Sequence, residues 1–185
     1  SLCDWSSDVC SSDLPRNPQS LLSKYTLSNQ INTESGKNRM KSPKCDVELE
    51  DAVLNDIIPV KYCPKSEGFW ISAKNYEAWL ANLPLWYAPE EILPYYNQFE
   101  NFVPSLFDSK AGFCPECGSY LSRSKINIKQ PFYIECCMSC RGIWFDNGKE
   151  WEILEDLGLH TRVYDIFSSQ WQAKVRQHQQ EMINR

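Results

Sequence analysis

Residues 113–146 read FCPECGSYLSRSKINIKQPFYIECCMSCRGIWFD and contain two Cys-x2-Cys pairs, at 114/117 and 137/140, with 19 residues between the pairs. A tight turn aims two thiolates at one point, and a glycine beside each pair accommodates a left-handed turn. Two such turns on neighbouring hairpins complete a tetrahedron of soft thiolate ligands. The spacing therefore predicts one structural Zn²⁺ bound by Cys114, Cys117, Cys137 and Cys140 in a closed shell.

Three alternatives remain for these cysteines, namely an iron–sulfur cluster, a redox-active Cys-x2-Cys pair and buried free thiols. A redox pair would explain one pair and leave the other unused. Cys136 adds a fifth thiol directly before Cys137. We interpret Cys136 as a small buried hydrophobic residue and not as a ligand.

The segments around the cysteines have strand and helix patterns. Ile126 and Ile128 alternate with polar residues before Pro131, which predicts two short strands around a turn. Residues 145–159 follow with a helical pattern, which Asp146 or Asn147 would cap and Gly158 would end. We therefore expect a β-hairpin followed by a helix.

The same pattern occurs a second time, 74 residues earlier. YCPKSEGFWISAKNYEAWLANLPL aligns without a gap with CCMSCRGIWFDNGKEWEILEDLGL, so that cysteine, glycine, tryptophan and several leucines coincide. A chance match of apolar residues would not place Cys63, Gly68 and Trp70 over Cys137, Gly142 and Trp144. The sequence therefore predicts two tandem units, with a first helix capped by Ser72 and stopped by Pro84.

The first unit lacks ligands. Ser66 aligns with Cys140, and upstream we align Cys45 and Glu48 with the pair Cys114 and Cys117. Only two thiols remain, Cys45 and Cys63, and serine is a poor zinc ligand. We expect the first unit to be metal-free and to depend on its packing, with a Cys45–Cys63 disulfide as the minor alternative.

The stretch from CPECGSYL to CCMSCRGIWFDNGKEWEIL resembles the transcription-factor-IIB-like zinc-finger family of small bacterial proteins, whose domains run Cys-Pro-x-Cys-Gly-x-x-Leu, a hairpin, Cys-x-x-Cys-x-Gly-x-Trp-Leu-Asp and an acidic helix. Phe145 stands where leucine is usual. The resemblance covers residues 113–155 well and 44–81 more weakly. It implies a zinc-ribbon fold and, by name alone, a link to nucleic acid.

The N-terminal segment carries the remaining two cysteines, Cys3 and Cys10. Residues 4–14, DWSSDVCSSDL, resemble the conceptual translation of a sequencing adapter, so we expect residues 1–39 to be artefactual and Met40 to be the natural start. The alternative is a genuine disordered tail. Either way, seven cysteines are left for the fold.

These patterns predict an α+β protein in five segments. They are an artefactual or disordered segment (1–39), a degenerate zinc-ribbon-like unit (40–83), an aromatic and proline-rich connector (84–112), a zinc-ribbon unit (113–159) and a C-terminal helix (160–185). The connector would either pack between the units or expose Trp86, Tyr87, Tyr95, Tyr96 and Phe99 to a partner. Val163, Ile166, Phe167, Trp171 and Val175 would form one face of the final helix. His160 and His178 are interpreted as non-ligands.

Charge and composition limit the classes of function that the sequence favours. The net charge is −5, which opposes a general electrostatic grip on nucleic acid. A small basic cluster beside the hairpin supplies the candidate nucleic-acid contacts Arg123, Lys125, Lys129 and Arg141. We see no catalytic constellation or membrane-spanning stretch, and expect a cytoplasmic, zinc-stabilised protein-binding adaptor; the alternative is a weak nucleic-acid-binding zinc ribbon.

Overall fold

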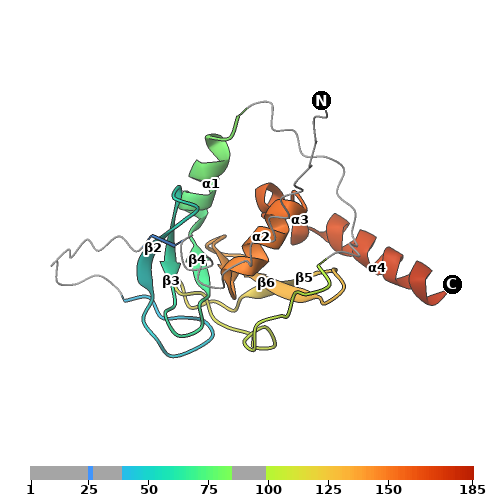
Figure 1. The fold of residues 1–185 in the computed structure, drawn as a ribbon, viewed down its shortest axis with the longest axis horizontal. Helices are drawn as coiled ribbons and strands as arrows, with labels where there is room; N and C mark the ends of the chain where they lie inside the picture. Colours follow the sequence, from blue (N-terminus) through green and yellow to red (C-terminus); the bar gives the residue numbers. More distant parts are fainter. Residues whose placement is uncertain (1–24, 27–38, 85–98) are drawn as a thin grey trace, which may run out of the picture.

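In the computed structural model, residues 25–26, 39–84 and 99–185 are described. The strands are β1 (Tyr25–Thr26), β2 (Glu50–Leu54), β3 (Ile58–Tyr62), β4 (Phe69–Ile71), β5 (Ser122–Ile126), β6 (Phe132–Cys136) and β7 (Ile143–Phe145). They form one antiparallel sheet in the order β1-β2-β3-β4-β7-β6-β5. The helices are α1 (Ala73–Ala81), α2 (Gly148–Asp156), the 3-10 turn η2 (His160–Arg162), α3 (Val163–Ile166) and α4 (Ser169–Ile183). Helices α1, α2 and α3 lie to one side of the sheet (Figure 1).

The mixed α+β prediction is confirmed, and both halves contain the expected hairpin and helix. The side chain of Ser72 caps α1 by accepting from the Asn75 amide at 3.2 Å. Asn147 caps α2 by accepting from the Glu150 amide at 3.0 Å. The Glu150 carboxylate also accepts from the amide of Asp146, the residue before this cap, at 2.8 Å. Helices α1 and α2 therefore each begin where a short polar side chain accepts a hydrogen bond from an amide of the first turn.

A third short strand in each half, β4 and β7, was not predicted, and it joins the two halves into one sheet. β4 pairs antiparallel with β7 in the register Phe69↔Phe145, Trp70↔Trp144 and Ile71↔Ile143. The two tryptophans that align in the sequence thus lie directly opposite each other. The strand order is symmetric about this pair, with β2-β3-β4 on one side and β5-β6-β7 on the other, and neither half has a free edge at the junction.

The central strands are buried on both faces, which divides the core into two parts. Phe69, Ile71, Ile143 and Phe145 point into the larger core beneath the helices, where Tyr76 and Trp151 also lie. Trp70 and Trp144 point to the opposite face and pack with Cys63, Cys114 and Cys137. The period-two alternation of the strands therefore separates the helix-covered core from the cysteine-bearing face.

Two glycines permit the close approach of the tryptophans. A β-carbon on Gly142 would lie 2.1 Å from the Trp70 ring, and one on Gly68 would lie 2.3 Å from the Trp144 ring. Each half thus supplies the glycine on which the other half's tryptophan rests. The alignment of Gly68 with Gly142 reflects this reciprocal packing.

We expect Gly142→Ala to lower the free energy of unfolding by about 1–3 kcal/mol. The new methyl group would overlap the Trp70 ring, which is fully buried and has no space into which to move. Gly68→Ala should have a similar effect. Gly158→Ala is the matched control, since its φ of +70° adds backbone strain but no atom lies within 4 Å of the new methyl. Urea unfolding measures all three. A Gly142→Ala variant no weaker than the control would contradict the tryptophan–glycine packing.

Only parts of the first predicted segment and of the connector lie within the described residues. Within residues 1–39, Tyr25–Thr26 pairs with β2 and Arg39 is described, and the rest of that segment lies outside the described residues. In the connector, Trp86, Tyr87, Tyr95 and Tyr96 likewise lie outside them. Phe99 is half-buried against the core, and the Phe102 ring lies 5.1 Å from that of Phe132. Phe99 and Phe102 therefore pack against the core, whereas Val103 and Leu106 in the same part of the connector are exposed.

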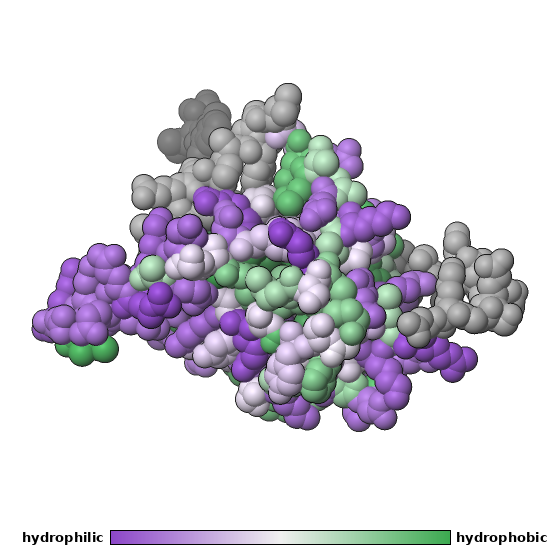
Figure 2. Space-filling model, turned by 180° about the vertical axis from the view of Figure 1, so that it is seen from behind, coloured by the Kyte–Doolittle hydropathy of each residue, from purple (hydrophilic) through white to green (hydrophobic). Residues whose placement is uncertain are grey.

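The prediction of one continuous C-terminal helix is wrong. The segment breaks into η2, α3 and α4, because Ser168 caps a new helix by accepting from the Trp171 amide at 3.2 Å. Val163 and Ile166 are buried in the core, whereas Val175 is the one buried residue of α4. The end of α4 forms a mainly hydrophilic arm (Figure 2). Among the described helices, none has the length and apolar composition needed to cross a bilayer.

Candidate metal centre

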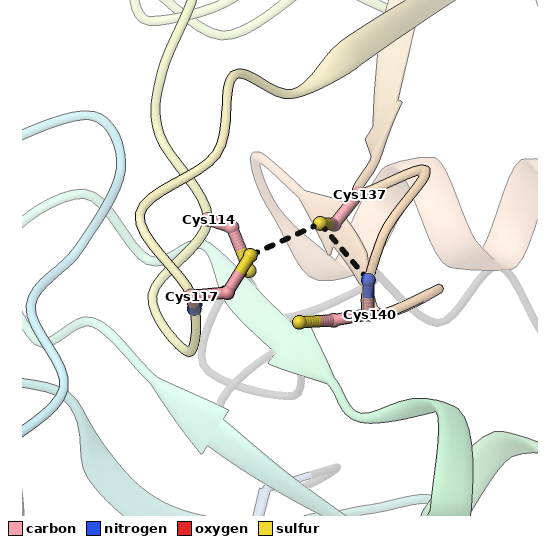
Figure 3. A group of neighbouring side chains, drawn as sticks. All are labelled: Cys114, Cys117, Cys137 and Cys140. Atoms are coloured by element: carbon pink, nitrogen blue, oxygen red, sulfur yellow. Dashed lines mark hydrogen bonds between the residues drawn. The ribbon is translucent and has the colours of Figure 1, made fainter.

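The four predicted ligands come together at one point. The sulfur atoms of Cys114, Cys117, Cys137 and Cys140 all lie within 4.8 Å of one another. The first two come from the turn before β5 and the other two from the turn between β6 and β7, and their side chains converge (Figure 3). Cys117 Sγ and Cys137 Sγ are 3.6 Å apart. A tetrahedral ion with metal–sulfur bonds of 2.3 Å places its sulfurs about 3.8 Å apart, so the group fits a single metal ion.

Backbone amides support the sulfurs in each turn. Cys114 Sγ accepts from the amides of Glu116 and Cys117, both at 3.4 Å, and Cys137 Sγ accepts from the Cys140 amide at 3.2 Å. An amide dipole aimed at sulfur favours the thiolate over the thiol. The turns thus orient the two buried sulfurs and stabilise the charge that a metal ligand must carry.

The left-handed residue differs between the two turns. Gly118 has a φ of +73°, as predicted for the first turn. In the second turn Arg141 has a φ of +62°, and Gly142 instead makes room for Trp70. Glycine beside Cys140 is therefore required for packing and not for the turn, which corrects the role expected from the sequence.

Three of the four thiols, Cys114, Cys117 and Cys140, have shifted pKa values without a metal. Hydrogen bonding to Ser119 and to Cys140 lowers the pKa of Cys117 to about 6, whereas burial raises the pKa of Cys114 to about 11. The pKa of Cys140 is raised, first by its hydrogen bond to Cys117. Because the four sulfurs cannot all ionise near neutral pH alone, binding a cation here must release protons, and acid must oppose it.

The first half holds a related but depleted group. The bond Ser42 N–Val47 O (2.8 Å) matches Cys114 N–Ser119 O (2.7 Å), and the isolated bridge Lys41↔Glu48 matches Phe113↔Tyr120. Both correspondences have an offset of 72 residues. Ser42 and Cys45 therefore take the places of Cys114 and Cys117.

This correspondence corrects the prediction that Glu48 occupies a former ligand position. Hydrogen bonds link Ser42, Cys45, Cys63 and Ser66, whereas Glu48 is exposed and pairs with Arg39 at 3.7 Å. The downstream turn agrees with the predicted alignment, since Cys63 N–Gly68 O (2.8 Å) matches Cys137 N–Gly142 O (2.9 Å). Two of the four ligand positions are thus serines, at opposite turns.

Three of the four candidate nucleic-acid contacts interact with other side chains of the protein. Arg123 bonds to Glu135 at 3.2 Å, Lys129 to Glu100 at 2.7 Å, and Arg141 stacks 4.1 Å from the centre of the Tyr164 ring. Lys125 lies on β5, opposite Tyr133. The four residues therefore do not form a group of unengaged cations.

A second group of titratable residues, which the sequence did not predict, lies in the core. Lys44 is buried and pairs with Glu135 and, at 3.5 Å, with Asp146. Glu150 and Asp108 adjoin this group, because carboxylate oxygens of Asp108, Asp146 and Glu150 lie within 4.8 Å of one another. Burial raises the pKa of Glu135 to about 7 and raises that of Glu150 well above its usual range. The Lys44 ammonium is thus the counter-ion of a buried acidic cluster, 91 residues from Glu135 in the sequence.

An open pocket of about 500 Å³ extends from the start of α1 to the cysteine turns. Trp70, Glu116 and Cys140 lie at its cysteine end, and Trp70 Nε1 donates to Glu116 Oε1 at 3.1 Å. Cys117 is itself exposed. The site is therefore open to solvent on the side of Cys117 and Cys140, whereas Cys114 and Cys137 are buried.

Cys136 lies apart from the metal group. Its side chain is buried in the helix-covered core, and burial raises its pKa to about 12. Its Sγ contacts the Cys137 carbonyl oxygen at 3.7 Å. Strand alternation thus turns two successive cysteines to opposite faces of the sheet.

Comparison with protein-family models, with curated proteins and with solved structures found no match.

Proposed function

We propose that this chain is a zinc-binding protein in which one four-cysteine site stabilises a tandem zinc-ribbon-like fold, and that the fold serves as a protein-binding adaptor. The proposal rests on the convergence of four sulfurs from two separate turns. A set made only of thiolates suits Zn²⁺, and four protein ligands leave no position for a substrate. A structural role follows from this closed shell.

The matching turns of the two halves support the repeat and the resemblance to transcription-factor-IIB-like zinc fingers. Both halves have a hairpin, a third strand and a capped helix, and their turn hydrogen bonds correspond one to one at four places. The absence of two ligand cysteines from the first half supports a metal-free first unit. We therefore propose one zinc ion per chain.

Exposed apolar side chains near the cysteine turns support a protein partner. Phe113 and Tyr120 are 57% and 64% exposed and stack edge to face at 4.7 Å, while Met138 in the second turn is 61% exposed. Exposed aromatic and methionine side chains are typical of protein contact surfaces. The internal pairing of Arg123, Lys129 and Arg141 argues against the nucleic-acid alternative.

Metal stoichiometry tests the proposal. Native mass spectrometry of the full chain should find one zinc per chain, and cobalt substitution should give the intense thiolate charge-transfer bands of a tetrahedral four-sulfur site. Cys117→Ser and Cys140→Ser should each lose the metal. The matched control is Cys45→Ser, the equivalent of Cys117 in the first half, which should retain it. Two zinc ions per chain would overturn the metal-free first unit, and none would overturn the whole proposal.

A further inference from the structure

The remnant site in the first half contains two thiols that face each other. Cys45 Sγ and Cys63 Sγ are 3.3 Å apart and belong to different turns. This distance is shorter than the 3.6 Å between Cys117 and Cys137 at the metal centre. A disulfide bond is about 2.0 Å long, so the two sulfurs need to approach by about 1.3 Å.

The groups around the pair favour thiol chemistry over metal binding. The other two corners of the former tetrahedron are the hydroxyls of Ser42 and Ser66, which hydrogen-bond to the sulfurs. Neutral hydroxyls are weak ligands for a soft cation, so two thiols do not complete a four-coordinate site. The same hydroxyls can stabilise a thiolate.

The two thiols have complementary properties. Cys63 is fully buried, yet the hydrogen bonds from Ser66, Ser42 and Cys45 outweigh the effect of burial and lower its pKa. Cys45 is half-buried, in a turn beside the exposed residue Asp46, and its pKa is raised, first by burial. One sulfur is therefore reachable by a reagent, and the other is prepared to react with its neighbour.

We propose that Cys45 and Cys63 form a reversible redox pair that closes a disulfide while the four-cysteine site keeps its metal. With a small disulfide such as oxidised glutathione, the Cys45 thiolate attacks one sulfur and expels a glutathione thiolate. The Cys63 thiolate then attacks Cys45 Sγ and expels the second glutathione. Two electrons and two protons pass from the protein to the small disulfide, which leaves as two reduced molecules.

The position of the pair gives the bond a structural consequence. Cys63 packs against Trp70, the tryptophan that faces Trp144 across the central strand pair. The bond would tie the turn at residues 42–45 to the end of β3, closing a loop between residues that are 18 positions apart. Such a cross-link restricts the unfolded chain and stabilises the first half, where no metal does so. The two halves would thus be held by different chemistry, one by metal and one by redox state.

Glutathione titration of the full, zinc-loaded chain tests this inference. At a high ratio of oxidised to reduced glutathione, we expect the intact mass to fall by two hydrogen atoms, peptide mapping to place the bond between Cys45 and Cys63, and the zinc content to stay constant. Dithiothreitol should restore the original mass. The oxidised form should unfold at a higher urea concentration than the reduced form.

Variants separate this pair from the other thiols. Cys45→Ser and Cys45→Ala should abolish the mass change, and Cys136→Ser, which alters a buried thiol of the opposite core, should leave it intact. Cys45 is half-buried, so its variants are expected to fold, and near-ultraviolet circular dichroism checks this. Complete alkylation of Cys45 and Cys63 after oxidation, a stable glutathione adduct on Cys45, or a bond that includes any of the four metal-site cysteines would overturn the proposal. Zinc content is measured independently, so its absence would contradict the proposed function without deciding the redox pair.

Discussion

Removing the zinc ion that we propose for the four-cysteine site is expected to unfold the second half of the chain and to weaken the first. The strands that flank the ligand-bearing turns have only three to five residues, and the turns bring together sulfurs that repel one another when ionised. Binding of structural zinc contributes roughly 10–16 kcal/mol in small zinc fingers, whereas a whole domain is stable by only about 5–15 kcal/mol. The metal term is therefore comparable to the total stability.

The shared sheet should spread this loss to the first half. β7 is the neighbour of β4, and Trp144 covers Gly68 on the opposite half. When β7 detaches, β4 loses a hydrogen-bonded partner and Trp70 loses its support on Gly142. We expect chelation to produce one cooperative transition rather than an intact first half beside an unfolded second half.

Cys117→Ser measures this effect with little loss of packing, because the Cys117 side chain is exposed. Its urea midpoint with zinc should resemble that of the wild-type chain with a chelator, and Cys45→Ser should respond to zinc as the wild type does. Amide hydrogen exchange locates the unfolded strands. Unchanged protection of β5, β6 and β7 in the chelated protein would show that packing alone holds this half.

Acid should have the same effect as chelation. Metal ligation requires all four cysteines as thiolates, so protonation competes with zinc, and the stability that zinc provides falls as the pH is lowered. This direction is opposite to that expected of the buried carboxyl groups, and the two can be separated by comparing variants at saturating zinc.

The features that the sequence predicted are those encoded within short stretches. Cys114 to Cys140 lie close enough for spacing alone to indicate a shared ion, and Ser72 or Asn147 marks a helix start through contacts three residues away. The features it missed are long-range. Nothing local indicates that Trp70 and Trp144, aligned as equivalents, would also be neighbours in the sheet.

Ser42 illustrates a second limit of the sequence. Alignment by cysteines places Cys45 over Cys114, because no residue type identifies serine as a former ligand. Backbone hydrogen bonds shift this register by three residues and place Ser42 there instead. The sequence already offered a Cys45–Cys63 disulfide as the minor alternative, and the shift adds that the other two corners of this site are hydroxyls.

Replacing Lys44 with methionine is expected to destabilise the fold by about 3–5 kcal/mol at pH 8, because Glu135 and Asp146 lose their buried counter-ion. Lys44→Met keeps the length of the side chain, so little of this loss arises from a cavity. Lys41→Met is the matched control, because Lys41 forms an ion pair with Asp46 at 2.6 Å but is 67% exposed. Solvent screens exposed ion pairs, so the control should have little effect.

The Lys44 effect should depend on pH in a defined direction. Glu135 has a pKa of about 7 in the fold, raised by burial from an ordinary value of 4.5, so folding favours its protonated form. The stability from this group is present below pH 4.5 and is lost as the pH rises through 7. Loss of the Lys44 charge raises the pKa of Glu135 further and extends the loss above pH 7.

The difference in unfolding free energy between the wild type and Lys44→Met should therefore be small near pH 5 and should grow toward pH 8. Taking this difference at each pH, with zinc saturating, cancels the opposite dependence of the metal site. The double variant Lys44→Met/Glu135→Gln removes the charge that Lys44 balances, and it should recover much of the loss at pH 8. A penalty that is the same at both pH values would mean that Lys44 acts by packing, and that its charge does not hold the acidic cluster together.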